Sequence, residues 1–304
     1  MSKYLISIVG PTAIGKTSLS IKLANHYNTE IISADSRQFF KEMSIGTAAP
    51  TEAEMNEAKH HFIHHKSVTE HYNVGCFEKD AIALLDALFL KHDIVIMVGG
   101  SGLYVDAVTK GLDNFPEVDS SIREKLNNEL SSKGLKHLKD QLKALDKTSY
   151  NTIALDNPHR VIRALEICIG TGQPYSSFLN QEKVSRNFKT ISVGLTAERE
   201  TIYKRINERV DNMMEEGLLD EVKSLVKFKK LNSLNTVGYK EIFKYLDGEV
   251  DLDFAISEIK KNTRRFAKRQ ITWFKKDKDI EWFDYKSGTE EIIDCINKKI
   301  QLNK

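Results

Sequence analysis

The stretch GPTAIGKT, residues 10–17, follows directly on the apolar run YLISIV, residues 4–9. Its two glycines, with Lys16 and Thr17 behind them, satisfy the pattern G-x4-G-K-[S/T]. The apolar run is typical of a buried strand, and residues 16–27 are expected to form a helix. In this strand–loop–helix context, backbone N–H groups, the helix N-terminus and the Lys16 ammonium can surround a phosphate group, while Thr17 can ligate Mg²⁺. The sequence therefore predicts a phosphate-binding loop.

The remainder of the chain alternates between strand and helix patterns. EIISADS (30–36) indicates a second strand ending at Asp35, DIVIMVGG (93–100) a third and FKTISVGL (188–195) a fourth. FEKDAIALLDALFL (77–90) has the periodicity of a helix. Unbroken apolar strands that alternate with helices predict an α/β fold, a mostly parallel sheet with a phosphate loop as in P-loop NTPases.

The alternation stops between residues 116 and 187, where helical periodicity occurs without a strand. Asp119 or Ser120 can cap a helix there, and Gly134 can break one. We therefore expect a small all-helical insertion domain at 116–187. The sheet domain would comprise residues 1–115 and 188–304, the second part ending in helices.

Composition restricts the class of protein. The chain has 304 residues, 40% of them hydrophobic, and a net charge of +2. No apolar run approaches the roughly 20 residues that span a bilayer, so no membrane segment is expected. Three widely spaced cysteines are typical of a reduced, cytoplasmic protein. Nine Lys or Arg residues between 260 and 278, with aromatic neighbours, mark a candidate phosphate- or base-contacting surface.

Asp35 is the acidic residue expected nearest the phosphate loop. Ligands of open α/β sheets lie at the carboxyl ends of the strands, so Asp35 should face the same crevice as the loop. It could organise Mg²⁺ or act as a general base. Spacing alone does not separate a kinase from a transferase with a diphosphate leaving group. The third strand ends in GGSGLY without an acid, which favours the transferase.

Six further blocks, read in order, resemble the bacterial tRNA dimethylallyltransferase family, whose members prenylate the N6 amine of the adenosine beside the anticodon, at tRNA position 37. The blocks span most of the chain: DSRQFFKEMSIGTAAP, GGSGLYVDAV, NPHRVIRALE, RINERVDNMMEEGLLDEV, TVGYKEI and RRFAKRQITWF. The resemblance implies two substrates, tRNA and dimethylallyl diphosphate, with Mg²⁺ as cofactor, and we expect a monomer.

The resemblance also implies residue roles. Asp35 would accept the proton of the adenine amine, and Thr17 would lie at both the metal and the diphosphate. Arg209 is our choice for a diphosphate-binding arginine, with Arg205 as the alternative. The remaining expected diphosphate ligands form the loop itself: Gly10, Pro11, Thr12, Ala13, Ile14, Gly15 and Lys16. The residues expected at the tRNA are Asp35, Ser36, Arg37, Gln38, Ser101, Arg123, His159, Arg160, Val161, Ile162, Arg163, Lys268 and Arg269.

Some positions depart from the family pattern. Ala49 replaces a lysine, and His64 replaces an aspartate within HHFIHH. The histidine run could chelate Zn²⁺ if it were helical, but it carries no cysteine or acid at ligand spacing. Two alternatives to the transferase are left open: an ATP-dependent small-molecule kinase, and a tRNA-binding relative without catalytic activity.

Overall fold

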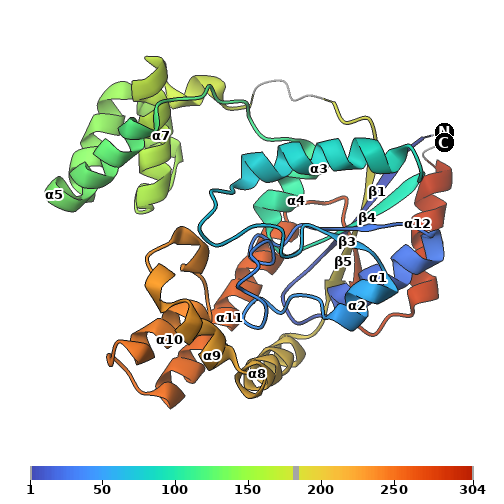
Figure 1. The fold of residues 1–304 in the computed structure, drawn as a ribbon. Helices are drawn as coiled ribbons and strands as arrows, with labels where there is room; N and C mark the ends of the chain where they lie inside the picture. Colours follow the sequence, from blue (N-terminus) through green and yellow to red (C-terminus); the bar gives the residue numbers. More distant parts are fainter. Residues whose placement is uncertain (1, 181–184, 303–304) are drawn as a thin grey trace. The chain divides into compact units, whose positions relative to one another are not determined.

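The protein is described here from a computed structural model that covers residues 2–180 and 185–302. Within these residues a six-stranded parallel sheet has the order β3-β2-β4-β1-β5-β6 (Figure 1). The strands are β1 (Tyr4–Val9), β2 (Ile31–Ser33), β3 (His60–His61), β4 (Ile94–Val98), β5 (Lys189–Thr196) and β6 (Glu281–Asp284). The predicted parallel α/β sheet is confirmed.

Two features of the sheet differ from expectation. β2 ends at Ser33, so Asp35 lies in the turn two residues beyond the strand rather than at its last position. β3 and β6 were not predicted, because they have two and four residues and carry no apolar run. Both are edge strands that depend on pairing with β2 and β5.

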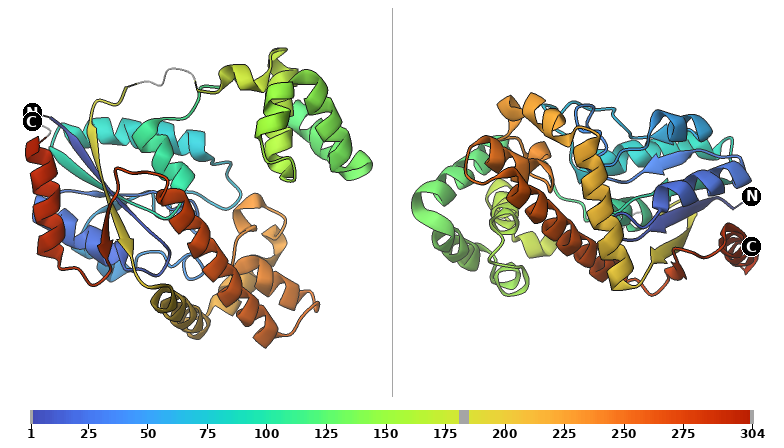
Figure 2. Two further views of the ribbon diagram at one scale, coloured as in Figure 1. Left: turned by 180° about the vertical axis from the view of Figure 1, so that it is seen from behind. Right: turned by 90° about the horizontal axis from the view of Figure 1, so that it is seen from below.

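Helices cover both faces of the sheet. Ile6 and Ile8 of β1 face a core shared with α1 (Lys16–Tyr27), α8 (Arg199–Glu215) and α12 (Thr289–Leu302). Leu5 and Val9 face the opposite core, shared with α3 (Val74–Phe89) and α4 (Gly102–Lys110). Figures 1 and 2 show the two helical layers on either side of the strands. Burial on both faces explains the continuous apolar pattern of β1 and β4.

A third core joins the segment after β2 to the C-terminal helices. Phe40 and Met43 pack against residues of α9 (Leu218–Ser224), α10 (Tyr239–Leu246) and α11 (Leu252–Phe274). The 3₁₀ turns η2 (Val226–Phe228) and η3 (Asn232–Leu234) contribute Phe228 and Leu234 to this core. The short helix α2 (Glu52–Glu57) buries no residue and contacts α1. The third core holds the chain that follows Asp35 against α9 and α10.

Residues 111–185 form a separate compact unit, and residues 1–110 and 186–304 form the other. The smaller unit contains α5 (Ser120–Leu145), α6 (Lys147–Thr152), α7 (Pro158–Thr171) and the 3₁₀ turn η1 (Tyr175–Phe178). Asp119 caps α5, and Gly134 interrupts it with φ of 79°. Leucines of α5 and α7 give this unit a core of its own. The predicted limits were 116 and 187, and residues 181–184 of that range lie outside the described residues.

The composition led to expectations about membrane segments, cysteines and the basic run at residues 260–278. No helix in the described part of the chain is long and apolar enough to cross a membrane. Cys76, Cys168 and Cys295 are free thiols, and Cys168 is buried. Most of the basic run lies on α11, where Lys268 and Arg269 are exposed.

Candidate active site

The loop between β1 and α1 has the geometry of an anion site. Gly15 precedes the first residue of α1 with φ of 106°, so no side chain covers the helix N-terminus there. Gly10 has φ of 143°, and a Cβ on it would lie 2.5 Å from the Leu195 carbonyl oxygen of β5. Glycine is therefore required for the loop to leave β1 so close to the neighbouring strand. The open first turn of α1 is left to bind an anion.

Lys16 folds back over this loop. Its Nζ atom donates a hydrogen bond to the Pro11 carbonyl oxygen at 2.7 Å. Burial lowers the pKa of Lys16 to about 7; the charge of Arg209 adds to the shift and that of Asp35 opposes it. The Lys16 ammonium has few anionic neighbours. A bound diphosphate would therefore stabilise its charged form.

Two arginines of α8 approach the loop in different ways. Arg205 Nε donates to the Ala13 carbonyl oxygen at 2.7 Å, and its guanidinium lies 5.2 Å from the centre of the Tyr285 ring. Arg209 Nη1 lies 3.4 Å from the Thr12 hydroxyl oxygen. Burial, and then the charge of Arg205, lowers the pKa of Arg209. Arg205 thus supports the loop, whereas Arg209 presents its charge to the cavity.

Two cavities meet at Asp35 and Arg209. The first, of about 600 Å³, is lined by the phosphate loop from Thr12 to Thr17. The second, of about 540 Å³, lies beside it and is lined by Ser36, Ser101 and Arg269 among others. Asp35 and Arg209 line both cavities. The arrangement lets two ligands reach one carboxylate and one guanidinium from different sides.

The Asp35 carboxylate is oriented by its own turn. Its Oδ1 atom accepts the backbone N–H of Arg37 at 3.0 Å, and its backbone N–H contacts Ser33 Oγ at 3.4 Å. The Arg37 guanidinium donates to the carbonyl oxygens of Asn232 and Ser233 at 3.1 and 2.8 Å. The turn that carries Asp35 is therefore tied to the third core.

The neighbours predicted to contact tRNA have protein partners. Gln38 Nε2 donates to the carbonyl oxygens of Thr47 and Ala48 at 3.3 and 3.1 Å. The Ser101 hydroxyl accepts the backbone N–H of Ser36 at 3.1 Å. Arg37 and Gln38 thus act as structural donors; Arg37, Ser36 and Ser101 line the second cavity, and Gln38 lines the first. Their contact with tRNA stays a prediction.

Gln270 is a site residue that the sequence analysis missed, although it lies in the block RRFAKRQITWF. Its Oε1 atom accepts the Thr12 backbone N–H at 2.9 Å, and its Nε2 atom donates to the Gly100 carbonyl oxygen at 2.9 Å. It lines both cavities. One buried amide on α11 therefore joins the phosphate loop to the end of β4, and no local pattern indicates such a contact.

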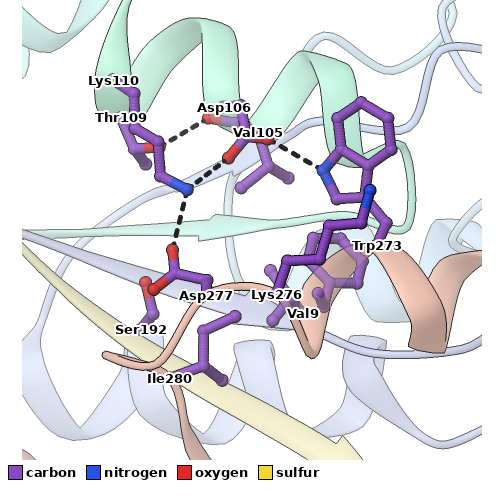
Figure 3. Close-up of a pocket in the computed structure, with 11 residues that line it drawn as sticks. Val9, Val105, Asp106, Thr109, Lys110, Ser192, Trp273, Lys276, Asp277 and Ile280 are labelled. Carbon is purple, nitrogen blue, oxygen red and sulfur yellow. Dashed lines mark hydrogen bonds and ion pairs between the residues drawn. The ribbon is translucent and has the colours of Figure 1, made fainter.

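A smaller cavity of about 180 Å³ lies behind Trp273, between α4 and the end of α11 (Figure 3). Trp273 Nε1 donates to Asp106 Oδ2 at 2.8 Å. Lys110 Nζ lies 2.9 Å from Asp106 and 2.8 Å from Asp277. These charges satisfy one another, so the cluster supports Trp273, whose indole also lines the second cavity.

The helical unit holds the next set of predicted tRNA contacts. The Glu166 carboxylate, 7% exposed, is bound by Arg123 at 3.0 and 2.6 Å and by Arg163 at 3.0 Å. Val161 and Ile162 are buried in the core of this unit. The prediction that these two side chains contact tRNA is corrected, because they pack inward. His159 and Arg160 are exposed in the first turn of α7.

The histidine run is not a helix. His60 and His61 form β3, and Phe62 and His64 have φ of 63° and 49°. The described residues contain no group of three His, Cys, Asp or Glu side chains placed to hold a metal ion. The helical spacing that would have brought the histidines together for Zn²⁺ is therefore absent. His60 and His64 instead line the first cavity.

A parallel sheet with a glycine-rich loop entering α1, and a ligand crevice at the strand ends, defines a P-loop fold. A family model described as IPP transferase matches residues 38–277. The chain belongs to this family.

The relatives and solved structures that match the chain agree with this assignment. It is 61% identical to the tRNA dimethylallyltransferase of Christiangramia forsetii, over 99% of each chain. It is 57% identical to the tRNA dimethylallyltransferase of Flavobacterium psychrophilum, over 98% of this chain and 99% of the relative. The structure of the full-length tRNA isopentenylpyrophosphate transferase of Bacillus halodurans matches with a TM-score of 0.72 at 39% identity, over 99% of this chain and 96% of the other.

A structure of a eukaryotic dimethylallyltransferase acting on tRNA matches with a TM-score of 0.82 at 27% identity. That match covers 99% of this chain and 80% of the other. The likeness to both solved structures therefore extends over 99% of this chain.

Proposed function

We propose that the chain transfers the dimethylallyl group of dimethylallyl diphosphate to the N6 amine of the adenosine that follows the anticodon of tRNA, with release of diphosphate. The observation that carries the proposal is the meeting of two cavities at Asp35 and Arg209, one of them lined by the phosphate loop. Eight relatives at 46–61% identity that bear the name tRNA dimethylallyltransferase support it. We propose further that it acts as a monomer, in the cytoplasm.

The leaving group would occupy the first cavity. Backbone N–H groups of the loop, the first turn of α1 and the Lys16 ammonium would bind the diphosphate. Arg209 would add a positive charge. Its stabilising effect would increase as the allylic C–O bond breaks and negative charge moves onto the departing oxygen. Arg205 would act at a distance, by fixing the Ala13 carbonyl and with it the loop.

The nucleophile would enter from the second cavity. An exocyclic amine of adenine is a weak nucleophile, because its lone pair is delocalised into the ring. Asp35 would accept the amine proton as the N–C bond forms, which avoids a cationic product. The target base must leave the anticodon stack to reach this carboxylate. The apolar and aromatic walls of the cavity, Met213 and Phe266 among them, suit a base and a prenyl chain.

The donor groups suit Mg²⁺. The Thr17 hydroxyl and the Asp35 carboxylate line the same cavity, and Mg²⁺ typically takes one or two protein oxygens together with phosphate oxygens and waters. We propose that Thr17 would hold the ion. When bound, it would supply positive charge that stabilises the departing diphosphate.

Exposed cations of each unit would contact the tRNA backbone. Arg160 lies in the first turn of α7 of the helical unit, and Lys268 and Arg269 lie on α11. Arg269 lies 5.6 Å from the centre of the exposed Phe266 ring and lines the second cavity. Arg123 and Arg163 could also reach a phosphate, in competition with Glu166.

The direct test is mass spectrometry of unmodified tRNA incubated with the protein, dimethylallyl diphosphate and Mg²⁺. We expect one prenyl group on the adenosine after the anticodon, and its formation at least about 10²-fold slower when Asp35→Ala replaces the wild type. A parallel reaction with ATP and no tRNA tests the kinase alternative. ATP turnover without prenyl transfer would establish a kinase, and tRNA binding without transfer by freshly folded protein would establish a non-catalytic relative.

A further inference from the structure

Glu221 of α9 binds a segment that has no regular secondary structure. Its Oε2 atom accepts the backbone N–H groups of Ser44 and Ile45 at 2.9 and 2.7 Å. Its Oε1 atom accepts the backbone N–H of Gly46 at 2.9 Å and the hydroxyl of Tyr239 at 2.6 Å. Three successive amides and one phenol thus converge on a single carboxylate.

The number of donors matches the acceptor capacity of an ionised carboxylate. Two oxygens offer about four lone-pair positions, and four donors occupy them. Glutamine could not replace it, because the amide has one acceptor oxygen and two N–H donors of its own. An amide turned so that its oxygen serves Ser44 and Ile45 would place its NH₂ group against the N–H of Gly46.

The segment bound by Glu221 forms a wall of both cavities. Ser44 and Ile45 line the cavity of the phosphate loop, Gly46 lines the second, and Thr47 and Ala48 line both. On the other side, Gln38 binds the carbonyl oxygens of Thr47 and Ala48. Residues 44–48 are therefore held between Glu221 and the turn that carries Asp35.

Tyr239 of α10 packs against the segment bound by Glu221. Its side chain is fully buried, and a Cβ on Gly46 would lie 2.5 Å from its ring. The backbone of Gly46 is thus pressed against the phenol that also binds Glu221. Little room is left for the segment to move toward α10, and the carboxylate prevents it from moving away.

We propose that Glu221 is a positioning residue for the transfer reaction, which fixes residues 44–48 and thereby the shape of both substrate cavities around Asp35. The inference rests on the proposed function for its catalytic part. It acts through backbone placement, without contact to either substrate. Displacement of a positioning element by about 1 Å can lower a rate by 10²-fold.

The test compares Glu221→Gln with Asp220→Asn. Asp220 is the preceding residue of α9, and its carboxylate pairs with Lys223 on the surface. Hydrogen exchange followed by NMR should show the Gly46 amide exchanging at least about tenfold faster in Glu221→Gln, since a hydrogen bond to a charged acceptor is lost. Asp220→Asn should leave the exchange unchanged.

Steady-state kinetics provides the second readout. We expect kcat/KM of Glu221→Gln to fall about 10- to 100-fold, with KM raised for both substrates. The melting temperature should also fall, because the Gly46 amide loses its charged acceptor. Asp220→Asn should retain wild-type values. Gly46→Ala keeps Glu221 but forces the segment away from Tyr239, so it should lower kcat/KM by a similar factor. It provides the test if Glu221→Gln does not fold.

Wild-type kcat/KM in both Glu221→Gln and Gly46→Ala would overturn the inference, as would unchanged exchange at Gly46 in Glu221→Gln. Failure of the proposed function gives a different result, in which the wild type itself transfers no prenyl group. The exchange measurement needs no substrate, so it still reports whether Glu221 fixes the segment in that case.

Discussion

The guanidinium of Arg209 lies 3.4 Å from the hydroxyl of Thr12, inside the phosphate loop. Arg205, one turn earlier on α8, binds the backbone of the same loop instead. The two arginines are therefore not equivalent, although they share a helix and a loop. One has a charge available for a ligand, and the other has its guanidinium engaged by the protein.

Substitution of the two arginines should separate binding from stability. Arg209→Ala should weaken dimethylallyl diphosphate binding by about 10- to 100-fold, the value of a charge-assisted hydrogen bond, with little change in melting temperature. Arg205→Ala should lower the free energy of unfolding by about 1–3 kcal/mol, because the Ala13 carbonyl loses its charged donor. Calorimetric titration and thermal denaturation check these outcomes; equal effects of both substitutions on affinity would contradict them.

Diphosphate affinity should depend on pH through Lys16. Its pKa of about 7 in the free protein means that the ammonium loses its proton as the pH rises above 7. The bound anion favours the charged form, so affinity should be highest below about pH 7 and fall toward pH 9, by at most about tenfold per pH unit. Titration calorimetry at several pH values measures this.

Lys16→Arg is the control for the pH dependence, because a guanidinium keeps its proton over this range. Its affinity, whatever its absolute value, should stay level between pH 7 and 9. A decline as steep as that of the wild type would assign the titration to another group.

Asp35 should be needed for chemistry more than for binding. Single-turnover transfer by Asp35→Ala should fall at least about 10²-fold, which is the low end for loss of a general base. Affinity for both substrates should change little. Asp35→Asn keeps an oxygen for the Arg37 N–H but cannot take a proton, so it should be about as slow. Near-wild-type transfer by Asp35→Asn would leave Asp35 with a purely structural role.

The basic residues proposed to contact tRNA should differ in their effect on stability. Lys268→Ala should reduce the slope of log affinity against log salt by about one unit and leave the melting temperature unchanged. Arg123→Ala should also destabilise the protein, by about 1–3 kcal/mol, because the buried Glu166 carboxylate loses a two-hydrogen-bond partner. Filter binding at several salt concentrations and denaturant titration distinguish the two.

Elements with a continuous local sequence signal were predicted correctly. β1 and α1 were predicted at their observed limits, because a buried strand and its helix leave a continuous signal. β3 was missed, because two histidines become a strand only through pairing with Ile31 and Ile32. Likewise, Asp35 was placed at the end of a strand, since nothing in EIISADS marks the turn after Ser33.

The candidate site was likewise predicted only in part. The loop carries a spacing motif, the end of the second strand pattern indicated Asp35, and the resemblance to a family supplied Arg209. Gln270 and Glu221 have no such signal, because their partners at Thr12 and Gly46 lie far away in sequence. Val161 and Ile162 were expected at the tRNA because the resemblance covers the whole stretch 159–163, and it does not indicate which side chains of that stretch are buried.

The pairing of β1 with both β4 and β5 also sets the order in which the chain can fold during synthesis. Tyr4 pairs with Ile94 and with Lys189, so the central strand lacks one neighbour until residues beyond the helical unit have left the ribosome. Until then β1 can pair with β4, but its other edge is unpaired and Gly10 lacks the neighbouring Leu195 carbonyl. Residues 111–185 have their own core and can collapse earlier. The sheet beside Gly10 is therefore completed only late, once β5 has been synthesised.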